Sequence, residues 1–212
     1  MNLTIQEIEI KRRILEIKKE LLLLKVDYHI KTIDERVEAL YREYLKLYVQ
    51  VGRRIPNYRY DKWPYENNCY FYALDLPTPR FFGETFRYGF DTNVGLISNS
   101  PIYKGCLISL DNTLEAFYED LDALKIRVFE SDKLMPPVHD GYKIAMYYYN
   151  SEIGSDYHFV RQNSDGTWSS KIGYDYKFSL TDTPDDFRLY YDSSRYYEYV
   201  KTFEIVKPTL KR

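Results

Sequence analysis

The first fifty residues repeat apolar positions with the spacing of helices that pack along a seam. Apolar residues follow alternating steps of four and three positions, interrupted once by Glu7, and the repeat then restarts in a second frame. The first frame comprises Leu3, Ile10, Ile14, Ile17, Leu21, Leu24 and Tyr28, and the second comprises Ile33, Val37, Leu40, Tyr44, Leu47 and Val51. Between them, Thr32 to Glu35 reads Thr-Ile-Asp-Glu, a capping box that starts a new helix. The pattern predicts two helices that end before Gly52 and Pro56.

Three arrangements satisfy this apolar stripe. The two helices fold back on each other as a hairpin, pack on the following domain, or pair with another copy of the chain as a coiled coil. A short heptad run is a weak signal, so packing within the chain and a homo-oligomer through residues 3–51 stand as equal alternatives. If the helices join subunits, deletion of residues 1–51 should abolish oligomers. We expect an N-terminal helical segment over residues 1–52 and one further domain over residues 53–212.

The pattern changes in the second half of the chain. Apolar residues at helical spacing predict a short helix from Cys69 to Leu76, with Asn67 or Asn68 as its cap. Residues 77–112 are dense in Gly and Pro and predict a long loop region. A second helix is predicted from Leu114 to Phe129, capped by Asn112 or Thr113.

Strands follow the second helix. Runs rich in aromatic and β-branched residues, separated by turn signals, predict four strands. They are Lys143 to Tyr149, Tyr157 to Gln162, Thr167 to Lys171 and Tyr199 to Val206, with 186–199 ambiguous. Helices first and antiparallel strands later indicate an α+β fold.

Composition and charge narrow the functional classes. The formal net charge is -2, which predicts no binding to nucleic acid or to anionic lipid. Two cysteines are too few for a disulfide framework, and neither has the neighbours of a structural zinc site, so we expect no metal and no cofactor. No stretch is long and apolar enough for a signal peptide or a membrane span, which predicts a cytoplasmic protein with no membrane partner.

Cys69 and His158 are the candidate catalytic residues. A thiol attacks a carbonyl only when a base or a local field lowers its pKa, and the start of a helix supplies such a field. His158 lies in a predicted strand, where residues 158, 160 and 162 share one face, and a loop centred on Ser164 would set Ser170 opposite it. A cysteine, its base and a third residue that orients the base form the logic of a catalytic triad. Taken singly, both residues are more often buried structural side chains.

Two motifs resemble a known family. The stretch Asn-Cys-Tyr-Phe-Tyr-Ala-Leu at 68–74, and Asp-Tyr-His-Phe at 156–159 followed by Ser-Asp-Gly-Thr-Trp-Ser at 164–169, resemble the papain-like NlpC-type superfamily of cysteine peptidases and amidases. Members of this branch occur in bacteria, phages and large DNA viruses. The resemblance covers roughly residues 60–175 and implies a papain-like α+β domain whose Cys69 lies on a helix beside an antiparallel sheet.

The resemblance implies roles for particular residues. Cys69 would be the nucleophile and His158 the general base, with Ser170 as the third residue, and the Cys69 amide and Asn68 would hold the oxyanion. The family typically has a histidine in a His-Lys-Pro-Gly run where this chain has Ser170-Lys171-Ile172-Gly173. A serine stabilises an imidazolium less than a stronger acceptor does, which favours reduced or lost activity.

Two functions follow as expectations. The first is a thiol hydrolase that cleaves a peptide, isopeptide or cell-wall amide bond through an acyl-enzyme on Cys69. The alternative is a catalytically weak or inactive papain-like scaffold that acts as a viral, phage or bacterial binding or assembly protein, located in the host cytoplasm or the virion if viral. The first requires the Cys69 sulfur and the His158 ring to lie near hydrogen-bond reach in one crevice.

Overall fold

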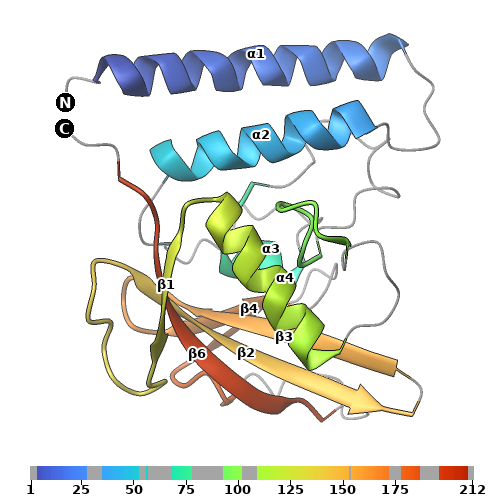
Figure 1. The fold of residues 1–212 in the computed structure, drawn as a ribbon. Helices are drawn as coiled ribbons and strands as arrows, with labels where there is room; N and C mark the ends of the chain where they lie inside the picture. The colour runs from blue at the N-terminus through green and yellow to red at the C-terminus, as the bar shows by residue number, and fades with distance from the viewer. Residues whose placement is uncertain are drawn as a thin grey trace.

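The described residues form an α+β fold in which four helices lie over a six-stranded antiparallel sheet (Figure 1). The structure is a computed structural model. It describes residues 4–27, 35–52, 56, 68–77, 93–101, 109–152, 154–171, 178–186 and 196–209. The α+β prediction and the helical N-terminal region are confirmed.

Helices α1 (Ile5–Asp27) and α2 (Glu35–Val51) form an antiparallel hairpin, one of the three arrangements that the sequence left open. The described part of the first apolar frame is buried at Ile10, Ile14, Ile17 and Leu21. A capping box opens α1: the Thr4 amide donates to Glu7 Oε2 (2.7 Å), and the Glu7 amide donates to Thr4 Oγ1 (3.1 Å). The capping box predicted for Thr32 to Glu35 lies almost wholly outside the described residues.

The hairpin also packs on the rest of the chain. Tyr41 of α2 stacks on Phe71, with ring centroids 6.4 Å apart, and its hydroxyl donates to the Pro77 carbonyl (2.8 Å). One continuous core cluster contains α1 and α2 side chains together with those of the sheet. Two of the three predicted arrangements, the hairpin and packing on the following domain, therefore occur together.

Two short helices cover the sheet between the hairpin and the strands. Helix α3 (Cys69–Ala73) begins after Asn68, one of the two predicted caps, and ends three residues before the predicted end at Leu76. Helix α4 (Leu110–Ala123) begins four residues before the predicted start, because Ser109 Oγ accepts from the Asn112 amide (3.1 Å) and acts as the cap. It also ends earlier, since Lys125 adopts a left-handed conformation (φ 58°) that stops the helix.

The sheet has the strand order β1-β6-β2-β3-β4-β5. The four predicted strands are confirmed as β2 (Tyr142–Ser151), β3 (Gly154–Gln162), β4 (Trp168–Lys171) and β6 (Glu198–Val206). Strand β5 (Phe178–Thr181) was not predicted, and the first three residues of β1 (Arg127–Ser131) were predicted as the end of a helix. Both are short edge strands: β1 pairs with β6, which is distant in the sequence, and β5 pairs with β4, the strand that precedes it.

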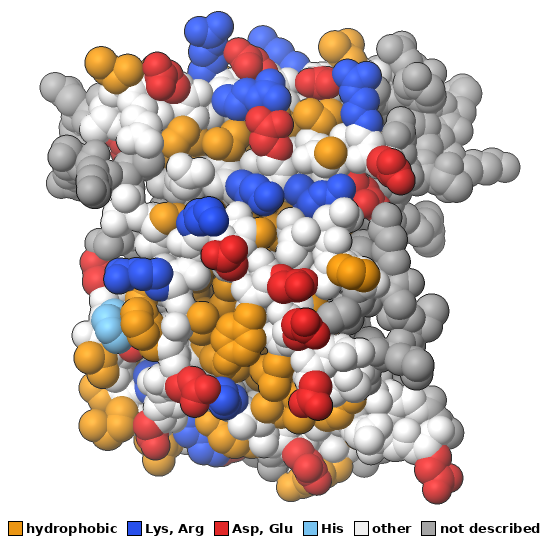
Figure 2. Space-filling view, in the orientation of Figure 1, with side chains coloured by type: hydrophobic (Ala, Val, Ile, Leu, Met, Phe, Trp, Pro, Cys, Tyr) orange, Lys and Arg blue, Asp and Glu red, His pale blue; other side chains and the backbone are white. Residues whose placement is uncertain are grey.

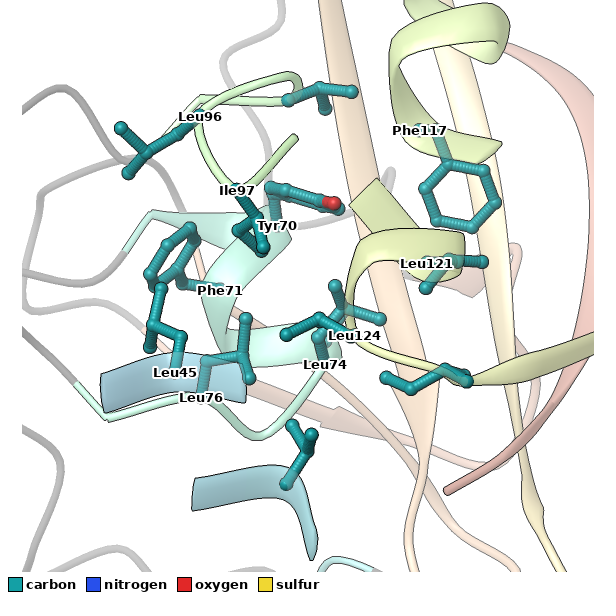
Figure 3. Close-up of a cluster of buried hydrophobic side chains, with 14 of the residues drawn as sticks. Leu45, Tyr70, Phe71, Leu74, Leu76, Leu96, Ile97, Phe117, Leu121 and Leu124 are labelled. Carbon is teal, nitrogen blue, oxygen red and sulfur yellow. The ribbon is translucent and has the colours of Figure 1, made fainter. Parts of the chain in front are cut away.

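The two faces of the sheet carry different side chains. The helix face contributes to the main core beneath α3 and α4, where Tyr70, Phe117 and Leu121 lie together (Figure 3). Its sheet residues include Ile144, Met146, Tyr157, Phe159, Phe203 and Ile205. The opposite face forms a second cluster of Ala145, Tyr147, Val160, Trp168 and Tyr197. Strict alternation along β2 and β3 separates these sets, so each strand residue belongs to one face.

Candidate functional site

Cys69 is the first residue of α3, and its thiol is buried against β3. The cap forms as predicted, because Asn68 Oδ1 accepts from the Phe71 amide (3.0 Å). Cys69 Sγ lies 3.9 Å from the Tyr157 carbonyl oxygen. Burial raises the pKa of Cys69 to about 12 and outweighs the opposing effect of a hydrogen bond with the Phe159 backbone. The expected lowering by the helix start is therefore not found, and the thiol is protonated at neutral pH.

Asn68, next to Cys69 in the chain, uses its side chain in hydrogen bonds within the fold. Its Oδ1 is the helix cap, and its Nδ2 donates to Asn93 Oδ1 (3.3 Å) in the turn that follows. Asn93 Oδ1 also accepts from the Tyr157 hydroxyl (3.0 Å), and the Val94 amide donates to that hydroxyl (3.2 Å). These bonds tie α3 to the turn and to β3. Both ends of the Asn68 amide, the predicted oxyanion donor, take part in this network.

His158 and Ser170 are in contact, as the sequence predicts. His158 Nε2 and Ser170 Oγ share a hydrogen bond of 2.5 Å, and both side chains are buried. The register differs from the prediction: the loop is centred on Asp165, so Val160 lies directly opposite Ser170 and the bond to His158 is diagonal. Burial lowers the pKa of His158 to about 3, so its ring is neutral at pH 7.

The sheet lies between the Cys69 thiol and the His158 ring. Cys69 packs in the cluster that contains Tyr157 and Phe159, the two neighbours of His158 in β3. Alternation turns the His158 side chain to the opposite face. There its ring lies 6.1 Å from the Tyr197 ring, and the Tyr197 hydroxyl donates to Asp156 Oδ2 (2.6 Å). The structure thus brings His158 and Ser170 together but does not bring Cys69 to either of them.

A buried group of charges on the helix face was not predicted from the sequence. Arg161 has no exposed surface; its guanidinium donates to the Tyr72 carbonyl (2.8 Å) and lies over the Tyr72 ring. Asp75 pairs with Arg161 (3.3 Å) and with the buried Lys207 (3.5 Å). Residues 157, 159 and 161 share one face of the strand, so the apolar Tyr157 and Phe159 were the sequence signal that Arg161 faces the core. These contacts fix the end of α3 to β3.

Asp120 of α4 holds the turn that lies near α3. Its carboxylate accepts from the Tyr70 hydroxyl (2.9 Å) and from the amides of Gly95 and Ser98 (2.7 Å each). Four hydrogen-bonding groups meet here in the core, so the arrangement is structural.

The other Cys and His residues of the chain are Cys106, His29 and His139, and the sequence assigns none of them a chemical role. Cys106 and His29 lie outside the described residues. His139 pairs with the buried Glu204, whose carboxylate also accepts from the Val138 and His139 amides. Among the described residues, no group of three or more His, Cys, Asp and Glu side chains is placed to hold a metal ion. None of the helices that the structure describes combines the length and apolar character needed to cross a bilayer.

The arrangement sets what the site can do. A cysteine hydrolase needs a thiol that a neighbouring base can deprotonate, and here the base and the thiol occupy different clusters. The His158–Ser170 pair has the residue types of a nucleophile and a base, but both side chains lie inside the opposite-face cluster, 1% exposed or less. What the geometry does provide is a rigid connection of α3, the turn at 93–100 and the sheet.

Comparison with known proteins gives a family. No curated protein matches this chain, and no solved structure does. A family model described as a domain of unknown function, DUF7689, matches residues 67–200, more than half of the chain. The match begins just before α3 and ends within β6, and so contains Cys69, His158 and Ser170. The chain belongs to the DUF7689 family.

Proposed function

We propose that this chain is a non-catalytic binding or assembly protein on a papain-like scaffold. The observation that carries the proposal is the position of Cys69 and His158 on opposite faces of one sheet. Thiol chemistry requires the base within hydrogen-bond reach of the sulfur, directly or through one water. The scaffold assignment rests on the resemblance of the two motifs at 68–74 and 156–169.

Protonation supports the same proposal. The pKa of Cys69 is raised to about 12 by burial, and the pKa of His158 is lowered to about 3 by burial. Both groups are neutral at pH 7. An activated cysteine shows the reverse, with a lowered thiol pKa and an adjacent imidazolium.

Surface composition is compatible with binding. Tyr118, Tyr196 and Tyr199 remain at least 38% exposed, although most described tyrosines are buried. Exposed tyrosines suit protein interfaces, because the ring supplies apolar area and the hydroxyl supplies a hydrogen bond.

Thiol alkylation tests the proposal directly. The wild-type protein is treated with iodoacetamide at pH 7.5, and the Cys69 peptide is quantified by mass spectrometry, in buffer and in guanidinium chloride. We expect alkylation of native Cys69 to be at least about 100-fold slower than in the denatured chain, because a buried neutral thiol reacts only after local opening.

The pH dependence of the alkylation rate shows which result would contradict the proposal. In a hydrolase, Cys69 of the native protein would be alkylated rapidly. The alkylation rate would increase with pH around a midpoint below about 7.5, and it would be lower in a His158→Gln variant. That result would overturn the proposal. Because the profile is measured on the wild-type protein, it does not depend on the folding of the variant.

A further inference from the structure

We propose that copies of this chain associate head to tail, through an outward stripe of α1 on one copy and an outward stripe of α4 on the next. The α1 stripe is Arg12, Leu15 and Lys19, and the α4 stripe is Glu115, Tyr118 and Asp122. The inference rests on the proposed assembly role and names the partner as a second copy of the chain.

The α1 stripe lies on the side of the helix that does not contact α2. Its inner side carries the buried seam at Ile10, Ile14, Ile17 and Leu21. On the outer side, Arg12 is 81% exposed, Leu15 is 58% exposed and Lys19 is exposed. Ile8 and Leu23 extend the stripe in both directions as exposed apolar residues. At 3.6 residues per turn these five positions share one face, which is apolar and positively charged.

The α4 stripe has the opposite charge. Glu115 is exposed, Asp122 has 85% of its side chain exposed, and Tyr118 between them is 38% exposed. Helix α4 contains no Lys or Arg. In Figure 2, acidic side chains border an apolar patch on the face where Figure 1 shows α4. Two basic side chains lie near this stripe. Lys125 lies 3.9 Å from Asp122, and both side chains are exposed, so the pair contributes little. Lys201 lies near Tyr118, and its charge is paired with Glu130 (2.6 Å).

The two stripes match in spacing as well as in charge. Each places a charge, an apolar or aromatic side chain and a second charge at positions i, i+3 and i+7, a span of about 10 Å along a helix. Laid side by side in parallel, Arg12 meets Glu115, Leu15 meets Tyr118, and Lys19 meets Asp122. The Arg12–Glu16 pair on α1 is an exposed pair, and a new carboxylate partner competes with it at little cost.

One chain does not bring its own two stripes together. In Figure 1, α1 is the outermost helix and α2 lies between it and the rest of the fold, whereas α4 lies directly on the sheet. Each chain therefore presents one stripe of each kind, which produces a heterologous contact that continues from copy to copy.

Charge reversal tests the contact. Sedimentation velocity is measured for the wild-type protein, for R12E/K19E, for E115K/D122K and for an equimolar mixture of the two variants. At about 50 mM salt the wild-type mass should rise with concentration, and at about 500 mM salt it should fall toward the monomer, because exposed pairs are screened. Each variant alone should stay monomeric. The mixture should associate again, because each variant offers the stripe that the other needs.

A matched control changes the same number of charges elsewhere. K46E/R127E reverses two exposed basic residues on α2 and β1, off both stripes, and should associate as the wild-type protein does. A wild-type protein that stays monomeric at low salt would overturn the inference, as would variants that still associate or a mixture that does not. Cys69 alkylation is independent of these outcomes, so a failure here is distinguishable from a failure of the proposed function.

Discussion

At the scale of single residues, burial sets the chemistry of Cys69 and His158. The His158 ring has no exposed surface and lies against Ser170 and the Tyr197 ring. An ionisable ring in such a place favours its neutral form, because burial removes the hydration that stabilises the charged form. The same reasoning applies to the Cys69 thiol, whose pKa is raised. Both side chains are therefore neutral at pH 7.

The lowered pKa of His158 makes stability depend on pH. The folded protein binds a proton at His158 only near pH 3, whereas the unfolded chain does so near pH 6.5, so stability falls as the pH falls between these values. From pH 7 to pH 5 the loss should be about 2 kcal/mol. Urea denaturation at the two pH values measures it.

Two variants isolate this effect. His158→Gln should show a smaller loss between pH 7 and pH 5, while Ser170→Ala, which keeps the buried ring, should retain the wild-type loss. An unchanged loss in His158→Gln would contradict the assignment. A proton NMR titration of the His158 ring in the wild-type protein, expected to show no titration above pH 5, gives the same answer without a mutation.

At the scale of elements, helix α1 of the N-terminal hairpin has a buried apolar side and an exposed side. The seam that the sequence presents as a coiled-coil repeat is used within the chain, against α2. The exposed residues on the other side of α1 remain available to a partner. The heptad spacing was thus a correct signal for helix packing, and the partner helix belongs to the same chain.

Alanine substitution distinguishes the two sides of α1. Ile17 has no exposed surface, and Ile17→Ala should lower the free energy of unfolding by about 2 to 5 kcal/mol. Leu15 is 58% exposed, and Leu15→Ala should lower it by less than about 0.5 kcal/mol. Urea denaturation followed by circular dichroism, in dilute protein at high salt, measures both. Equal effects would show that the seam does not face α2.

At the scale of the whole molecule, the hairpin and the sheet share one core. Tyr41 joins α2 to α3 through the Phe71 ring and the Pro77 carbonyl, and the main cluster runs from α1 to β6. Segments that share a continuous core unfold together. The division into residues 1–52 and 53–212 therefore does not separate the main core.

Calorimetry tests this coupling. The full chain should unfold in one cooperative transition, and removal of residues 1–51 should abolish it, because the α3 side chains that pack on α2 become exposed. Two resolved transitions in the full chain, or a cooperatively folded product after the deletion, would contradict the prediction. The charge reversals are accordingly a cleaner test of association than the deletion.

The sequence by itself determined the local elements. Local sequence patterns placed the seam of α1, the cap of α3 at Asn67 or Asn68, and four of the six described strands, because these features depend on residues close to one another in the chain. It also placed residues 158, 160 and 162 on one strand face. Strand β1 could not be found in this way, since its short sequence pairs with the distant β6. Strand β5 was missed because its 4 residues give too short a pattern, although its partner β4 directly precedes it.

Only the tertiary structure decided which face of the sheet receives α3. Both faces of β3 are apolar, with Tyr157 and Phe159 on one side and Val160 beside His158 on the other, so strand alternation is compatible with either choice. The choice depends on the joint packing of α3 with α2, α4 and the turn at 93–100, which are distant in sequence. That packing sets the Cys69 thiol on the face opposite the His158 ring.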